Sequence, residues 1–164
     1  MDLTSFNDAS PGEAAAHLRP CVDIDRWVQE IVAARPFASA ADLTAFAAAA
    51  APEWTEAEID AALAHHPRIG ERAAGNGTEA AMSRREQSGV AVSPETTEKL
   101  ARGNASYEDK FGRVFLIRAA GRSADDVLTA LEKRLSHTPE QELPIIADEL
   151  REIAVLRLEG MLST

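Results

Sequence analysis

Residues 138–161 read TPEQELPIIADELREIAVLRLEGM, which is the longest helical pattern in this chain of 164 residues. A threonine followed by a proline and a run of acidic and amide residues is typical of a helix N-terminus. Pro144 lies inside the pattern and should bend the helix or move its start, because a proline removes a backbone hydrogen bond. The apolar residues recur at helical spacing and form one face: Leu150, Ile153, Ala154, Leu158 and Met161. The segment therefore predicts a long amphipathic helix that lies against a core.

The composition favours the same class of fold along the whole chain. Alanine occurs 32 times, whereas valine and isoleucine together occur 16 times. Alanine is the best helix former, and β-branched residues favour strands. The length also fits one ordinary domain of about 100–200 residues. We therefore expect an all-α, single-domain, multi-helix bundle that covers residues 1–164.

Capping residues and prolines divide the rest of the chain into shorter helices. Thr55 with Glu58 three residues later is a capping box at the start of one of them. Gly103-Asn104 weakens another helical pattern and is a candidate interruption of it. The predicted helices span residues 11–20, 23–35, 40–51, 56–66, 94–111 and 124–135.

Two segments depart from the helical pattern. Phe111–Gly121 is the one β-like apolar run, and it predicts an extended and buried crossover between helices. Gly70–Gly77 is rich in glycine and predicts a flexible loop.

Charge and cysteine content exclude several classes of protein. Lys plus Arg is 17 and Asp plus Glu is 27, so the formal net charge is −10. A nucleic-acid-binding protein needs a basic face, and an anionic membrane surface would repel this chain for the same reason. Cys21 is the single cysteine, which excludes an internal disulfide framework and a multi-cysteine zinc site. We expect Cys21, Trp27 and Trp54 in the core.

No segment of the sequence reads as a membrane span or a leader. No apolar h-region follows Met1, and no apolar run reaches the roughly 18–20 residues of a membrane span. We therefore expect a cytoplasmic protein without a membrane partner.

The first candidate site residue is a histidine on an apolar stripe. Ile59, Leu63 and His66 share one helix face, whereas His65 points about 100° away. Pro67 disfavours the helical conformation at His66, so the ring should lie where the chain leaves the helix. An imidazole titrates close to neutrality and is suited to proton transfer. The alternative is a hydrogen-bonded core histidine or a helix C-terminal cap.

Arg157 is the second candidate, because it falls near the middle of the apolar face of the last helix. Burying a guanidinium without a partner is expensive, so Arg157 should meet a carboxylate of the protein or of a ligand. The alternatives are a structural ion pair, or a side chain that extends along the apolar face to place its charge in water.

The third candidate is a polar cluster. If the segment around it is helical, Ser83, Glu86 and Gln87 lie on one face. The alternative is a capping box formed by Ser83 and Glu86, but an apolar run should follow such a box, and Ser88-Gly89 follows instead.

Four motifs are spaced along the chain, and they read HHPRIGE at 65–71, SRREQSG at 83–89, KFGRVFLIRAAGRS at 110–123 and LRL at 156–158. Together they resemble the 2-oxo-4-hydroxy-4-carboxy-5-ureidoimidazoline (OHCU) decarboxylase family of urate catabolism. The N-terminal part is similar too, with Phe6-Asn7, with Cys21 shortly before Trp27, and with RPFAS at 35–39. The resemblance covers nearly the whole chain, and the joint spacing of the motifs is specific where any one of them alone is weak.

The resemblance implies an all-helical homodimer with no metal and no organic cofactor. It implies a lyase that removes CO2 from OHCU and yields S-allantoin. The catalytic histidine of the family precedes a proline, which matches His66, and its Ser-x-x-Glu-Gln motif matches Ser83, Glu86 and Gln87. The arginine that binds the substrate carboxylate lies on the last helix and matches Arg157. We therefore expect His66, Glu86 and Arg157 to be catalytic.

The resemblance also implies which residues contact the substrate around these three. An extended segment of the family offers backbone hydrogen bonds to the substrate, and a cysteine is common where Arg118 stands here. If that position contributes mainly backbone, the function should survive, with the Arg118 side chain directed away from the pocket or adding a charge to it. The expected substrate-binding residues are Pro67, Ser83, Arg84, Arg85, Gln87, Phe115, Leu116, Ile117, Arg118 and Ala119.

Two other functions compete with this interpretation. A non-catalytic helical binding module would expose an apolar groove and use His66 and Arg157 as structural residues. An enzyme of the same fold would act on a different ureido or imidazoline acid, and competition by allantoin-like ligands would distinguish it.

Overall fold

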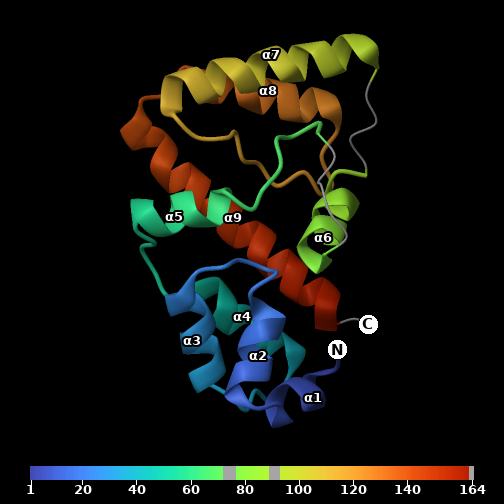
Figure 1. Ribbon diagram of the computed structural model, residues 1–164, viewed down its shortest axis with the longest axis vertical. Helices are drawn as coiled ribbons and strands as arrows, with labels where there is room; N and C mark the ends of the chain where they lie inside the picture. Colours follow the sequence, from blue (N-terminus) through green and yellow to red (C-terminus); the bar gives the residue numbers. More distant parts are fainter. Residues whose placement is uncertain (72–76, 89–92, 163–164) are drawn as a thin grey trace. The chain divides into compact units, whose positions relative to one another are not determined.

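The computed structural model describes residues 1–71, 77–88 and 93–162, and every regular element in these ranges is an α-helix (Figure 1). The all-α prediction is therefore confirmed. The chain divides into two compact units, of which the first joins Met1–Ala62 to Arg151–Thr164 and the second is Leu63–Leu150. Within the described residues, no helix combines the length and the apolar character that crossing a membrane requires.

Five short helices and the end of a long one build the first unit. Side chains that accept from backbone N–H groups begin several of these helices, as at Thr55, where the predicted capping box with Glu58 is confirmed by bonds of 2.7 and 3.2 Å. The helices are α1 (Leu3–Asp8), α2 (Pro11–Leu18), α3 (Asp25–Ala33), α4 (Ala40–Ala49), α5 (Glu56–Leu63) and the last part of α9 (Pro139–Leu162).

The core of the first unit contains both tryptophans and the cysteine, as predicted. Trp27 is fully buried, and its indole N–H donates to the Ala47 carbonyl of α4 at 2.8 Å. Arg151 of α9 donates to the carbonyls of Ala50 and Ala51 at 2.6 and 2.9 Å, and its guanidinium lies 4.1 Å from the centre of the Trp54 ring. These bonds satisfy carbonyl groups that the end of α4 leaves without helical partners.

The second unit contains α6 (Thr78–Glu86), α7 (Pro94–Phe111), α8 (Ala124–Leu135) and the first part of α9. Helices α7 and α8 lie side by side in Figure 1. Gly103 permits this approach, because a Cβ atom at its position would overlap the side chain of Leu131 in α8. The glycine predicted to interrupt a helix therefore lies inside a continuous one, and that prediction was wrong because close packing, rather than a break, uses the missing side chain.

The predicted non-helical segments have different outcomes. Gly112 ends α7 in the left-handed conformation at φ 71°, and the chain then runs extended to Ala119 with Phe115, Leu116 and Ile117 buried. The predicted crossover is confirmed, although its first residue, Phe111, still belongs to α7. The predicted loop Gly70–Gly77 lies mostly outside the described residues. Pro144 does not move the start of α9, which begins at Pro139.

A two-pronged ion pair joins α3 to α5 in the first unit. Arg26 Nε and Nη2 donate to the two Glu58 carboxylate oxygens at 2.8 and 3.0 Å. Hydrogen bonds from Arg26, followed by those from Thr55, outweigh partial burial and lower the pKa of Glu58 from 4.5 to about 2. A carboxylate with a lowered pKa stabilises the fold above its ordinary pKa, and this contribution is lost as the pH falls from 4.5 toward 2.

We expect Glu58→Gln to flatten the acid limb of the stability profile. Between pH 5 and pH 2, urea unfolding of the wild type should lose more stability than that of Glu58→Gln, by up to about 1 kcal/mol because both partners are partly exposed to water. Glu132→Gln, which neutralises an exposed carboxylate of α8, is the matched control. Identical acid limbs for all three proteins would contradict the assignment.

Candidate active site

His66 lies just beyond the end of α5. The sequence pattern predicts a helix as far as His66, but α5 ends at Leu63, and the His66 N–H donates to the Leu63 carbonyl at 3.0 Å in a tighter turn. The predicted helix end was therefore three residues too late, because Pro67 excludes the helical conformation before it. His66 is half-buried while His65 is exposed, in agreement with the helical stripe.

A tight turn follows at Arg68–Glu71. The Glu71 N–H donates to the Arg68 carbonyl at 3.0 Å, and Gly70 has φ +88°. A positive φ at the third position of a turn is typical of type II and favours glycine there. The central peptide of this turn is bonded at both ends: the Ile69 carbonyl accepts from Asn104 Nδ2 at 2.9 Å, and the Gly70 N–H donates to Gln87 Oε1 at 3.0 Å.

The polar cluster lies at the end of α6. Ser83 is 2% exposed, inside the last turns of α6, and the helix begins at Gly77 as its N-cap, so Ser83 is not an N-cap and the capping-box alternative was wrong. Glu86 is the last residue of α6, and Gln87 is its C-cap. Glu86 and Gln87 are half-buried, whereas Arg85 is exposed. The structure therefore brings Gln87 to the turn that follows His66, as the hydrogen bond to Gly70 shows.

The extended segment is held along one edge by charged side chains. The Leu116 carbonyl accepts from Arg134 Nη1 at 2.6 Å, and the Arg118 N–H donates to Glu149 Oε2 at 2.7 Å. Residues two apart in an extended chain direct their backbone groups to the same edge, so Leu116 and Arg118 share the edge that faces α8 and α9.

Arg134 belongs to a buried network of ionisable groups. Its Nε donates to Glu142 Oε1 at 2.8 Å, Tyr107 donates its hydroxyl to the same oxygen at 2.5 Å, and His137 Nδ1 lies 2.9 Å from Glu142 Oε2. Burial raises the pKa of the Glu142 carboxyl, but the hydrogen bonds from Tyr107, His137 and Arg134 outweigh it, so the pKa is lowered overall. Burial, together with the bond to Glu142, raises the pKa of Tyr107.

Arg157 lies on α9 within the first unit. It is 4% exposed, and its Nη1 donates to the Pro20 carbonyl at 3.1 Å. This low exposure contradicts the alternative in which the side chain places its charge in water. Arg157 is therefore a buried guanidinium with a backbone acceptor, and its predicted role toward a ligand carboxylate stays a prediction.

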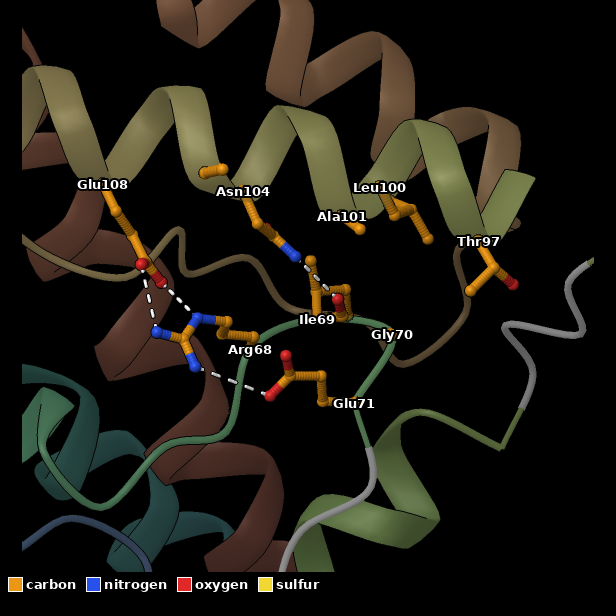
Figure 2. Close-up of a pocket in the computed structure, with 10 residues that line it drawn as sticks. Arg68, Ile69, Gly70, Glu71, Thr97, Leu100, Ala101, Asn104 and Glu108 are labelled. Atoms are coloured by element: carbon orange, nitrogen blue, oxygen red, sulfur yellow. Dashed lines mark hydrogen bonds and ion pairs between the residues drawn. The ribbon is translucent and has the colours of Figure 1, made fainter. Parts of the chain in front are cut away.

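A cavity of about 280 Å³ lies between the 68–71 turn and α7 (Figure 2). Asn104 on its wall carries a hydrogen bond to the turn, and sequence reasoning missed it because the Gly103-Asn104 pair looked like a helix break. The same reasoning missed Arg134, whose contacts come from segments far from it in the chain. A buried polar position on an otherwise apolar helix face is the one signal that would have found them.

Comparisons with known proteins identify the family of this chain. A family model for OHCU decarboxylase matches residues 7–159, so the chain belongs to the OHCU decarboxylase family. It is 31% identical to the 2-oxo-4-hydroxy-4-carboxy-5-ureidoimidazoline decarboxylase of Mus musculus, over 99% of this chain and 93% of that protein. It is 35% identical to the uric acid degradation bifunctional protein TTL of Arabidopsis thaliana over 68% of this chain, a match that spans 34% of that longer protein.

A solved structure has the same fold. The crystal structure of an OHCU decarboxylase in the presence of (S)-allantoin superposes with a TM-score of 0.68 at 24% identity. The match covers 88% of this chain and 95% of that chain.

We expect Glu142→Ala to destabilise the second unit strongly. Removing one partner of a buried ion pair leaves the other charge uncompensated, which typically costs about 3–5 kcal/mol. Urea unfolding followed by circular dichroism measures the loss. Glu140→Ala, an exposed carboxylate in the first turn of α9, is the matched control and should cost less than about 1 kcal/mol. Equal losses for the two variants would show that the buried network does not stabilise the unit.

Proposed function

We propose that this protein removes CO2 from OHCU and yields S-allantoin in urate degradation, without a metal or an organic cofactor. The observation that carries the proposal is membership of the OHCU decarboxylase family along residues 7–159. The residues that match the family motifs support it. The histidine followed by proline lies just beyond the end of α5 and is half-buried, and the Ser-x-x-Glu-Gln motif lies at the end of α6.

The reaction leaves an electron pair on the substrate ring and requires the protein to deliver a proton to that ring. Loss of CO2 breaks the bond between the carboxylate carbon and the ring carbon, and the electrons of that bond stay on the ring. They pass into the neighbouring imine, the carbon that carried the carboxylate becomes a carbonyl as its hydroxyl group loses a proton, and a proton adds to one face of the neighbouring carbon that carries the ureido group, which sets the configuration of the product. General acid–base groups make such proton transfers typically 10²–10⁴-fold faster.

We assign the proton transfers to His66 with help from Glu86. His66 accepts the proton of the 4-hydroxyl group or orients that group as its carbon becomes a carbonyl, and the imidazolium or a water then protonates the neighbouring carbon that carries the ureido group. A nearby carboxylate favours the charged form of an imidazole, while burial opposes it. We assign Glu86 this supporting role because it belongs to the Ser-x-x-Glu-Gln motif at the end of α6.

We assign substrate binding to Arg157, Gln87 and the extended segment. A guanidinium pairs well with a carboxylate through two parallel hydrogen bonds. Binding the leaving carboxylate too tightly would stabilise the ground state of the substrate, so Arg157 must orient the carboxylate more than it stabilises its charge. We assign the backbone contacts of this segment to Ile117, because the Leu116 carbonyl and the Arg118 N–H are already bonded to Arg134 and Glu149.

The assembly and location of the protein are part of the proposal. We propose that residues 1–164 act as one domain, since a single family model spans both compact units. A homodimer in the cytoplasm is proposed from the family resemblance of the sequence.

The direct test supplies freshly generated OHCU from urate, urate oxidase and hydroxyisourate hydrolase, and follows circular dichroism. We expect the S-allantoin signal to grow faster with the protein than without it. A signal that grows only at the spontaneous background rate would show that the proposed function is wrong.

His66→Ala should lower the decarboxylation rate by about 10²–10⁴-fold, because it removes the proposed acid–base group. The neighbouring exposed histidine gives the matched control, His65→Ala, which should keep the wild-type rate. Far-ultraviolet circular dichroism checks that both variants fold. A fully active His66→Ala would remove His66 from the mechanism.

A further inference from the structure

The central peptide of the 68–71 turn links two side chains from different helices. Asn104 of α7 donates to its carbonyl end at Ile69, and its N–H end at Gly70 donates to Gln87 Oε1 (Figure 2 shows the first of these bonds). A backbone N–H can only donate, so it fixes which end of the Gln87 amide faces the turn. Gln87 therefore directs its oxygen to Gly70 and keeps its NH2 group as a donor for other partners.

The orientation of this peptide is not set by the turn alone. Type I and type II turns differ mainly by a flip of the central peptide, and the glycine with positive φ makes the flipped form accessible. Once flipped, the peptide still needs an acceptor for its N–H and a donor for its carbonyl. Asn104 supplies the donor through a buried bond, and hydrogen bonds in series polarise one another.

The burial of Asn104 shows that its donor end matters. Asn104 is 4% exposed, and among the described residues no donor reaches its buried Oδ1. A buried acceptor without a partner typically costs about 1–3 kcal/mol. An apolar residue at position 104 would avoid that cost. The bond from Nδ2 to the Ile69 carbonyl is therefore the stabilising contact that an asparagine makes here and an apolar residue would not.

Other contacts across the cavity are less suited to hold the peptide. Arg68 forms a two-pronged pair with Glu108 at 2.5 and 3.1 Å and approaches Glu71 at 3.7 Å. Arg68 and Glu71 are exposed and Glu108 is half-buried, and ion pairs that water reaches contribute little. They hold the outer part of the turn, whereas the buried bond from Asn104 acts on the peptide that contacts Gln87.

We propose that Asn104 is a positioning residue that, through the Ile69–Gly70 peptide, fixes the amide of Gln87 so that its NH2 group donates to a carbonyl oxygen of the substrate. The inference rests on the proposed function in that Gln87 binds the substrate. It also sets a specificity, because this position of the site accepts a carbonyl oxygen of a ureido or ring amide and rejects an N–H group there.

A double-mutant cycle tests the path from Asn104 to Gln87. Asn104→Leu keeps a similar volume and removes the donor, and Asn104→Asp is the second variant if the first fails to fold. We expect either to lower kcat/KM for OHCU about tenfold, mainly through a higher KM, which is the range of one buried hydrogen bond. In a Gln87→Ala background the same change should have less than about a twofold effect, because its target is absent.

Nuclear magnetic resonance gives a readout that does not depend on activity. Asn104→Leu should speed hydrogen exchange at the Gly70 amide about tenfold and move the side-chain NH2 signals of Gln87, as loss of a hydrogen bond requires. Val127→Ala removes buried methyl groups from the apolar cluster that also contains Ile69, but it leaves the Asn104 amide in place, so it should change neither.

The outcomes separate the two proposals. Additive losses in the cycle, or an unchanged Gly70 amide in both Asn104 variants, would overturn the positioning role. If the wild type leaves OHCU at the background rate, the proposed function fails, and the Gly70 and Gln87 signals then decide whether Asn104 orients the Gln87 amide.

Discussion

The second unit depends on the buried ion pair between Arg134 and Glu142. The two side chains are 6% and 1% exposed, so neither charge can be stabilised by water. Each must therefore be satisfied by protein groups, and the groups that do so come from α7, from α8, from α9 and from the extended segment at Leu116. A buried charge tolerates few arrangements, because displacing one partner leaves the other uncompensated. The pair thus fixes where the extended segment lies.

An all-α protein has few backbone groups to offer a ligand. Inside a helix each N–H and each C=O is already bonded to a residue four positions away, and only the ends and the irregular segments have groups to spare. Among the residues of the second unit that the structure describes, the irregular segments include the 68–71 turn and the extended chain before Ala119. Side chains hold both of them on one side, Asn104 at the turn and Arg134 with Glu149 at the extended segment. The family's use of backbone contacts to its substrate is compatible with this arrangement.

The net charge of the chain and the local charge at Arg157 have opposite signs. A net charge of −10 disfavours anionic partners, yet a substrate of an OHCU decarboxylase carries a carboxylate. Fields of exposed charges fade over about 8 Å at physiological salt, so the global charge need not reach a buried position. Arg157 is buried on α9, where its positive charge acts at short range. In the proposed role of Arg157, one sheltered cation would therefore outweigh the acidic surface for a small ligand.

Local sequence patterns predicted most of the helices, because caps and prolines act within one turn of the chain, but they did not predict α1. Ser123 and Thr55 begin α8 and α5 where the pattern places them. Helix phase pointed to His66, Gln87 and Arg157, and the family motifs pointed to the same residues. Tertiary structure decided the close packing of helices and the hydrogen bonds between segments that are separated in the sequence. Gly103 serves the packing of α7 on α8, and Asn104 and Arg134 bond to segments far away in the chain. Such contacts depend on distances between helices, which no short stretch of sequence encodes, and the orientation of the Gln87 amide follows from them.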